Sequence, residues 1–188
     1  RRRHTRYPLV TGVQTCALPI CEAFAHTAYY DAMIARWFAE QQGIAFPDLF
    51  TLSYAKDQSL RYGENPHQNA TLYGTFTSIF SQLHGKELSY NNIMDIDAAS
   101  RIALEFDEPV TVIVKHNNPC GVGIGTTLSD AYQKAFATDT VSPFGGILAF
   151  NREIDLATAE TIHSLFAEVL IAPAFSDDAM ALLDRKST

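Results

Sequence analysis

Cysteines and metal-binding motifs are scarce in this sequence. The chain holds three cysteines, Cys16, Cys21 and Cys120, and none of them belongs to the CxxC spacing of a zinc site. Zinc nucleobase deaminases carry H-x-E and P-C-x-x-C motifs. Here Pro119 and Cys120 are followed by Gly123 where the second cysteine would stand, and no H-x-E occurs. The sequence therefore predicts a protein without a bound metal, and its few cysteines favour a reduced, cytoplasmic chain.

Excess positive charge and long apolar runs are missing as well. The net charge is −7, which argues against nucleic acid or a membrane surface as a partner. No apolar run approaches the roughly 18 residues that a membrane span needs. The P-loop pattern GxxxxGK(S/T) does not occur, which excludes that type of phosphate site. The hydrophobic fraction is 47% over 188 residues, which is enough for one domain with a sizeable core.

The first twenty residues differ from the rest of the chain. They read RRRHTRYPLVTGVQTCALPI, with four arginines before a short apolar stretch that polar residues interrupt. A signal or transit peptide is one interpretation. We favour the other, that residues 1–20 are foreign to the fold, and leave them out of the functional argument.

The richest stretch is VIVKHNNPCGVGIG at residues 112–125. The β-branched run 110–114 predicts a buried strand, and Thr127 predicts the cap of a following helix with an apolar face. Lys115, His116 and several glycines lie between the two. We therefore expect a ligand-binding loop between a strand's carboxyl end and a helix N-terminus, a place that favours an anion such as phosphate.

The remaining pattern predicts alternating helices and strands, and hence an α/β fold. Residues 60–68 and 142–146 are expected to form polar and glycine-rich loops, and residues 89–92 a turn. Helices are expected over 21–42, ended by Gly43, over 96–106, and from a cap at Asp155 to about 166, with a last one capped by Ser176. Strands are expected at 50–54, 70–76, 147–150 and 169–172.

Lys115 and His116 allow three interpretations. They can be structural, with a solvated lysine and a histidine bonded to backbone. They can act in acid–base and electrostatic catalysis, because histidine titrates near neutral pH and an ammonium stabilises an oxyanion. Cys120 can instead be a nucleophile activated by His116, although no residue placed by the sequence orients such a pair.

Five segments together resemble one family of enzymes. They are LRYGENPHQ (60–68), LSYNNIMDIDAA (88–99), VIVKHNNPCGVGIG (112–125), DAYQKAFATDTVSPFGGILAFNREID (130–155) and EVLIAP (168–173). They are similar to the bifunctional purine biosynthesis family, AICAR formyltransferase/IMP cyclohydrolase. The resemblance covers residues 21–185. It implies a zinc-free, cytidine-deaminase-like layered α/β fold. It also implies formyl transfer from 10-formyltetrahydrofolate to the 5-amino group of AICAR, in a homodimeric parent protein.

The resemblance also implies roles for single residues. His116 matches the family's general base, and Lys115 matches the residue that stabilises the transition state. The nucleotide-binding positions that it implies are Arg61, Tyr62, Asn117, Phe144, Gly145 and Glu168. A catalytically silent nucleotide-binding module that uses the same loops is the alternative function.

The resemblance further predicts how the chain is divided. Residues 21–47 would be a remnant of the cyclohydrolase domain with its linker, and residues 48–188 the N-terminal half of the formyltransferase domain. The chain would then be a fragment that is inactive alone, while the parent protein would also close the ring to IMP.

Overall fold

The computed structural model describes residues 10–184, and side chains from residue 18 onward. The chain forms two compact units, one up to Asp57 and the other from Gln58. The second unit holds every predicted site residue. No helix among the described residues is both long and apolar enough to cross a lipid bilayer.

The first unit is dominated by the helix α1, Val10–Gln41. It confirms the helix predicted over 21–42 and starts upstream of it. The helix ends as predicted at Gly43, which has a φ of 67°. There the N–H of Gly43 donates to the Glu40 carbonyl at 3.1 Å and that of Ile44 to the Ala39 carbonyl at 2.9 Å, as in a helix C-terminus capped by a left-handed residue.

The strand predicted at residues 50–54 is wrong. The segment has no strand partner, and Phe50, Leu52 and Tyr54 all expose more than half of their surface. Alternating apolar residues specify a strand only where a neighbouring strand and a core accept them. The strand β1 forms later, at Lys56–Leu60, and pairs with β2, Ala70–Tyr73, which confirms the strand predicted at 70–76 over a shorter range.

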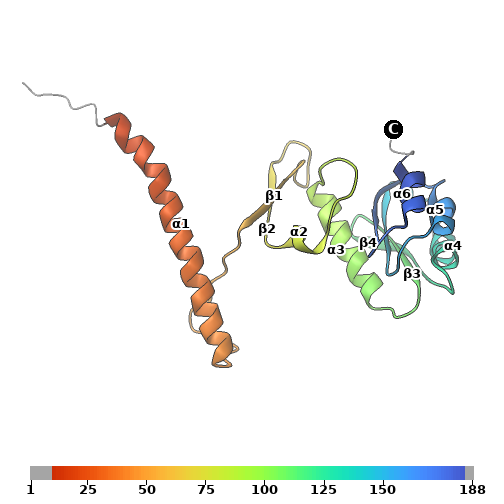
Figure 1. Ribbon diagram of the computed structural model, residues 1–188, viewed down its shortest axis with the longest axis horizontal. Coiled ribbons are helices and arrows are strands. Elements are labelled where there is room, and N and C mark those ends of the chain that lie inside the picture. The colour runs from red at the N-terminus through yellow and green to blue at the C-terminus, as the bar shows by residue number, and fades with distance from the viewer. Residues whose placement is uncertain (1–9, 185–188) are drawn as a thin grey trace, which may run out of the picture. The chain divides into compact units, whose positions relative to one another are not determined.

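A four-stranded sheet in the order β4-β3-β5-β6 is the centre of the second unit (Figure 1). It consists of β3 (Val110–Lys115), β4 (Asn118–Ile124), β5 (Gly146–Phe150) and β6 (Ala167–Ile171). The strand β3 is antiparallel to both β4 and β5, whereas β5 and β6 are parallel. The predicted α/β class is confirmed, with a mixed sheet.

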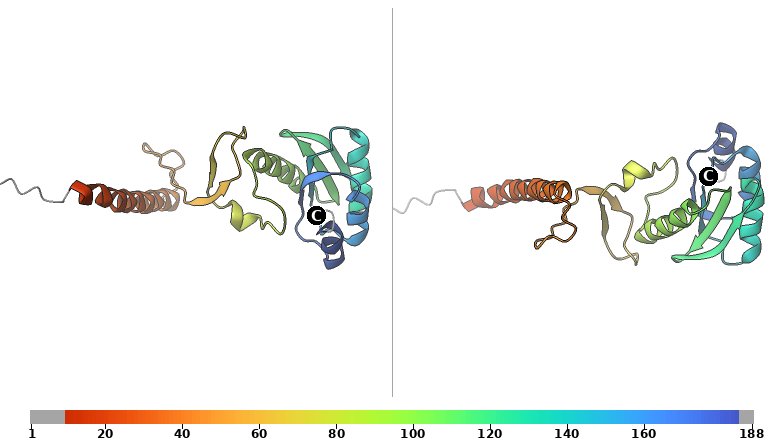
Figure 2. Two further views of the ribbon diagram at one scale, coloured as in Figure 1. Left: turned by 90° about the horizontal axis from the view of Figure 1, so that it is seen from above. Right: turned by 90° about the horizontal axis from the view of Figure 1, so that it is seen from below.

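Helices cover both faces of this sheet (Figure 2). On one face lies α3, Tyr90–Leu104, where Ile96, Ala99 and Ala103 pack against alternate residues of β3 and β5. On the other lie α4 (Leu128–Thr138), α5 (Leu156–Ile162) and α6 (Asp177–Asp184). The short helix α2, Phe76–Ile79, precedes α3. Burial of both strand faces explains why the runs of β3 and β5 are almost entirely apolar.

The loop predicted between β3 and α4 is instead a β-hairpin. Lys115 pairs with Asn118, so His116 and Asn117 form a two-residue turn, and β4 continues to Ile124. Both turn residues have positive φ, 54° and 61°, as a type I′ turn requires. The predicted residues Lys115 and His116 therefore lie at the opposite end of β4 from the α4 N-terminus.

The glycines of β4 serve packing rather than ligand approach. A Cβ atom on Gly121 would lie 2.1 Å from the Ala135 carbonyl oxygen, and one on Gly123 would lie 2.2 Å from that of Ala131. Both carbonyls belong to α4. The helix backbone therefore rests directly on the strand, which only residues without a side chain permit.

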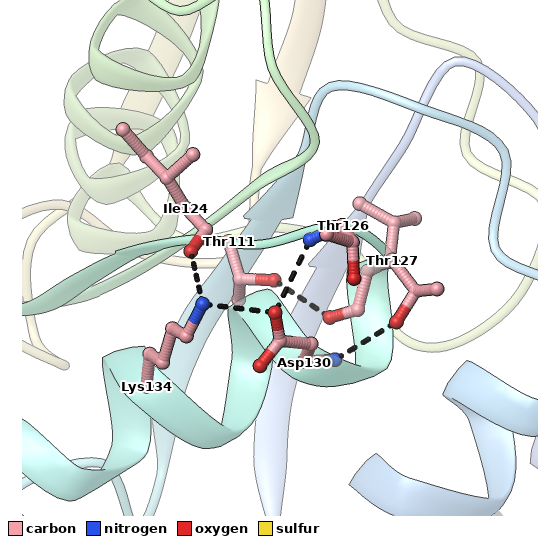
Figure 3. Close-up of polar contacts among 7 residues, drawn as sticks. Thr111, Ile124, Thr126, Thr127, Asp130 and Lys134 are labelled. Atoms are coloured by element: carbon pink, nitrogen blue, oxygen red, sulfur yellow. Dashed lines mark hydrogen bonds and ion pairs between the residues drawn. The ribbon is translucent and has the colours of Figure 1, made fainter.

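The α4 N-terminus is bonded within the protein (Figure 3). The predicted cap is confirmed, because the Thr127 hydroxyl accepts the N–H of Asp130 at 3.1 Å. The Asp130 carboxylate accepts from the Thr126 N–H at 3.1 Å and from Lys134 Nζ at 2.9 Å, and Nζ also donates to the Ile124 carbonyl at 3.0 Å. The two hydrogen bonds that the Asp130 carboxylate accepts lower its pKa, and the bond from Lys134 has the larger effect. A carboxylate already occupies the place where we expected an external anion.

Other helix starts match or correct the sequence predictions. The turn predicted at residues 89–92 is wrong, because Ser89 caps α3 and Asn92 lies in its first turn. Asp155 caps α5 as predicted, although this helix ends at Ile162 rather than near residue 166. Ser176 Oγ accepts the Ala179 N–H at 3.3 Å at the start of α6, as predicted.

Candidate active site

The predicted site residues gather at one edge of the sheet. Because β3 is antiparallel to β5 and β5 is parallel to β6, the end of β3 meets the beginnings of the other two strands. Val114 pairs with Ile147, and Gly146 pairs with Ala167. The residues next to these pairs, Lys115, Gly145 and Glu168, therefore lie at the same edge although 53 positions separate the first from the last.

Lys115 connects β3 to the segment before β5. Its Nζ donates to the Phe144 carbonyl at 2.7 Å. The Phe144 ring is 63% exposed and lies 5.3 Å from the Phe166 ring, centroid to centroid. Gly145 has a φ of 73°, and its N–H donates to the Phe166 carbonyl at 2.7 Å. Lys115, Phe144 and Gly145 therefore form one bonded group that leaves an aromatic face open.

His116 projects from the hairpin turn as an exposed side chain. Its carbonyl accepts from Asn118 Nδ2 at 2.8 Å. The next N–H, that of Asn117, donates to the Asp95 carboxylate at 2.6 Å, and Asp95 belongs to α3. An exposed imidazole on a turn held in this way is accessible to a substrate for proton transfer.

Glu168 is held by a residue that the sequence analysis assigned to a turn. Asn92 Nδ2 donates to Glu168 Oε2 at 2.8 Å. Asn92 is 7% exposed, and its Oδ1 accepts the Ser89 N–H at 3.0 Å while its own N–H donates to Ser89 Oγ at 3.2 Å. This is a capping box with asparagine in the place of glutamate or glutamine. In the sequence, the spacing Ser-x-x-Asn at residues 89–92 could have indicated this helix cap.

Arg61 and Tyr62 lie beside the beginning of α3. The Arg61 N–H donates to the Leu88 carbonyl at 2.9 Å, and the Tyr90 N–H donates to the Tyr62 carbonyl at 3.0 Å. The guanidinium carbon lies 4.9 Å from the centroid of the Tyr62 ring. An exposed cationic fork over an aromatic face suits a phosphate or a heteroaromatic ring.

A groove of about 1020 Å³ lies between α3, the residues that precede it, and β6. Arg61, Asn92 and Glu168 are among the residues that line it, as is Phe166. Lys115, His116, Asn117, Phe144 and Gly145 are not. The structure therefore brings two predicted binding residues into the groove and the catalytic candidates to the adjoining sheet edge, with Phe166 in contact with both.

The surroundings of Cys120 disfavour its thiolate form. It packs against the apolar cluster on the α4 side of the sheet. Burial raises the pKa of its thiol, Asp139 and Asp95 raise it further, and Lys115 opposes them only partly. Among the side chains that the structure describes, those of residues 18–184, no three from His, Cys, Asp or Glu are grouped so that they could hold a metal ion.

The family of this protein follows from its similarity to known sequences. A model of the AICARFT/IMPCHase bienzyme family matches residues 14–188, so the chain belongs to that family. This confirms the resemblance drawn from the five segments, and it extends upstream into the stretch that we interpreted as foreign.

Its relatives carry the name bifunctional purine biosynthesis protein PurH. The chain is 54% identical over 171 residues to the protein of Bacillus cereus (strain Q1), and 55% identical over 171 residues to that of strain 03BB102. The relative from Bacillus thuringiensis subsp. konkukian is 54% identical. Each alignment covers 88% of this chain and 34% of the relative, so the chain spans about a third of the relatives' length.

Proposed function

We propose that this chain contributes to formyl transfer in purine biosynthesis, from 10-formyltetrahydrofolate to the 5-amino group of AICAR. The observation that carries the proposal is the meeting of Lys115, His116, Gly145 and Glu168 at one sheet edge, in a chain that belongs to the AICARFT/IMPCHase family. A zinc-free, cytidine-deaminase-like fold is part of this proposal, as are a cytoplasmic location and a homodimeric parent protein that also closes the ring to IMP.

The chemistry assigns different tasks to the two catalytic residues. The amine of AICAR attacks the formyl carbon, a C–N bond forms, and the bond from that carbon to N10 of the folate breaks. His116 takes the proton that the amine loses, and the protonated imidazole returns it to N10 of the folate as the bond to the formyl carbon breaks. The ammonium of Lys115, held by the Phe144 carbonyl, stabilises the oxyanion that forms at the formyl oxygen.

The other predicted residues would bind the nucleotide. Arg61 would pair with the phosphate, and Tyr62 and Phe144 would offer aromatic faces to the imidazole ring. Gly145 would allow the backbone to come close to the nucleotide, and the Glu168 carboxylate would accept hydrogen bonds from its amide or amine groups. Asn117 would add a further polar contact. The division at residues 21–47 and 48–188 remains a prediction.

A nucleotide-binding module without catalysis is the second candidate. It is favoured by one observation: the groove is lined by Arg61 and Glu168 but by neither Lys115 nor His116. This candidate predicts that nucleotide binds and that no formyl group is transferred.

The first prediction separates these functions by replacing His116 in the complete gene product that contains this chain. We expect His116→Ala to lower kcat about 10²–10⁴-fold, because a positioned base contributes this much. Its affinity for AICAR should change little. The separate variant Lys115→Arg should retain only part of the parent's kcat, because a guanidinium fork does not replace a compact ammonium. Steady-state kinetics with both substrates varied, together with equilibrium nucleotide binding, measure these effects.

The matched control is His26→Ala, which removes an exposed imidazole from α1 in the other unit and should leave kcat unchanged. If the parent protein binds AICAR and transfers no formyl group, the module without catalysis is correct. If Cys120→Ala abolishes turnover while His116→Ala keeps it within a few-fold, the mechanism is wrong.

A further inference from the structure

The turn that carries His116 has an unusual backbone. His116 and Asn117 are the only non-glycine residues with positive φ in the part of the chain that the structure describes, and they are consecutive. Type I′ turns need positive φ at both central positions, and glycine usually supplies at least one of them. A turn built from His and Asn persists only where its surroundings hold it.

One peptide unit of this turn is held from both sides. The carbonyl of the His116–Asn117 peptide accepts from Asn118 Nδ2 at 2.8 Å, and its N–H donates to Asp95 Oδ1 at 2.6 Å. This peptide plane sets ψ of His116 and φ of Asn117. The first bond is local to the hairpin. The second connects the turn to a helix 22 residues earlier in the chain.

The helix that supplies Asp95 is firmly placed. Ile96 and Ala99, which follow Asp95 on α3, are buried against the sheet. The same helix holds Glu168 through Asn92, three residues before Asp95. Two side chains at i and i+3 on one helical face therefore fix two separate parts of the sheet edge.

We infer that Asp95 is a positioning residue, which fixes the His116–Asn117 peptide and so aims the imidazole of His116 at the substrate. This inference rests on the proposed formyl transfer. In this role Asp95 acts through the turn, by its hydrogen bond with the Asn117 N–H, and not by contact with the reacting atoms. A charged acceptor makes this hydrogen bond stronger than a neutral one would.

The test, which is the second prediction, compares variants of Asp95 in the complete gene product. We expect Asp95→Ala to lower kcat about 10–100-fold, because misplacement of a catalytic group by about 1 Å has effects of this size. The dissociation constant for AICAR should change less than about threefold, since the binding residues stay in place. Asp95→Asn keeps an acceptor oxygen for the Asn117 N–H and should retain most of the parent's kcat. If only the negative charge of Asp95 mattered, this variant would lose as much activity as Asp95→Ala.

The matched control is Asp97→Ala. Asp97 lies on the same helix, but it is exposed and pairs with Arg101 at 2.9 Å. This variant removes a carboxylate from α3 without touching the turn, and it should keep kcat and nucleotide affinity unchanged.

Hydrogen exchange of the Asn117 amide provides a readout that needs no activity. In the Asp95→Ala protein this amide should exchange at least about tenfold faster, while amides within β3 keep their protection. Asp95→Asn and Asp97→Ala should retain slow exchange. If Asp95→Ala does not fold, Asp95→Asn still reports both rate and exchange.

The outcomes are distinguishable. An active Asp95→Ala protein with unchanged kcat overturns the role of Asp95, as does unchanged exchange at Asn117. A loss of nucleotide affinity equal to the loss of kcat also overturns it, because the residue then supports binding. Absence of formyl transfer from the parent protein overturns the proposed function, and with it any catalytic role for Asp95.

Discussion

The two ends of the β3–β4 hairpin differ in how their polar groups are used. At the α4 end, the Asp130 carboxylate and Lys134 bond with each other and with the adjoining backbone, and the helix N-terminus is capped by Thr127 (Figure 3). At the turn end, His116 and Asn117 are exposed, and their peptide is held by a side chain from another helix.

We interpret the α4 end as the one that stabilises the fold and the turn end as part of the proposed reaction site. Bonds between neighbours in sequence close the α4 end and leave little for a ligand to bind. At the turn end one bond is local to the hairpin, but two others connect it to α3 and to the segment before β5, while the imidazole itself stays open to solvent. A strained backbone at an exposed polar residue is typical of functional sites.

The third prediction, with the largest expected effect on stability, breaks the α4 side of the hairpin. Gly123→Ala should lower the free energy of unfolding by about 3 kcal/mol, the upper end for overpacking, because its Cβ would lie 2.2 Å from a helix carbonyl oxygen that cannot move aside. Urea denaturation of the chain measures the change.

The control for Gly123→Ala is Gly85→Ala. Gly85 has a φ of 96°, and its Cβ would meet only Gln82 Nε2, at 3.9 Å. We expect a loss of about 1 kcal/mol there, from backbone strain alone. Equal losses at both positions would show that tight packing of α4 on β4 does not matter for stability.

The fourth prediction concerns the edge that the turn shares with Glu168. Asn92→Ala removes the capping partner of Ser89 and the donor to Glu168, so it should cost about 1–2 kcal/mol in unfolding free energy. It should also weaken nucleotide binding, because Glu168 is no longer held. Asp97→Ala, at an exposed position of the same helix whose carboxylate pairs with Arg101 at 2.9 Å, should change both quantities little. Denaturation and equilibrium binding decide between the two residues.

The fifth prediction is the smallest and returns to the α4 end. The pKa of Asp130 is lowered, chiefly by its hydrogen bond from Lys134, so its folded pKa lies below the unfolded one. The contribution of Asp130 to stability is therefore present above about pH 4 and is lost as the pH falls through the folded pKa. The stability difference between the parent and Asp130→Asn should shrink from pH 7 to pH 2. A difference that is the same at both pH values would contradict this linkage.

Local signals in the sequence predicted most of the elements. The β-branched run at 110–114, the cap at Thr127 and the glycine after α1 all depend on a few neighbouring residues, and each is confirmed. The hairpin was missed because its turn is His-Asn rather than Asn-Gly, and because glycines that admit a helix look in sequence like glycines that admit a ligand.

Sequence reasoning could single out the residues of the proposed site but not the residues that support them. Local chemistry and the family resemblance singled out Lys115, His116 and Glu168. Asn92 and Asp95 form hydrogen bonds with partners that are 76 and 22 residues away in the sequence. No pattern of neighbouring residues indicates contacts between positions so far apart. Only the mixed sheet, whose strand directions the sequence does not determine, brings these positions together.

The position of β6 at the margin of the sheet has a practical consequence. Its outer backbone groups carry no neighbouring strand among the described residues, and Val169, Leu170 and Ile171 are only partly covered. The unpaired N–H and C=O groups of such an edge strand are a template for pairing with strands of other molecules. When the 188-residue chain is produced alone, we expect β6 to be the first strand to pair with other molecules, and this pairing to lower the solubility of the chain.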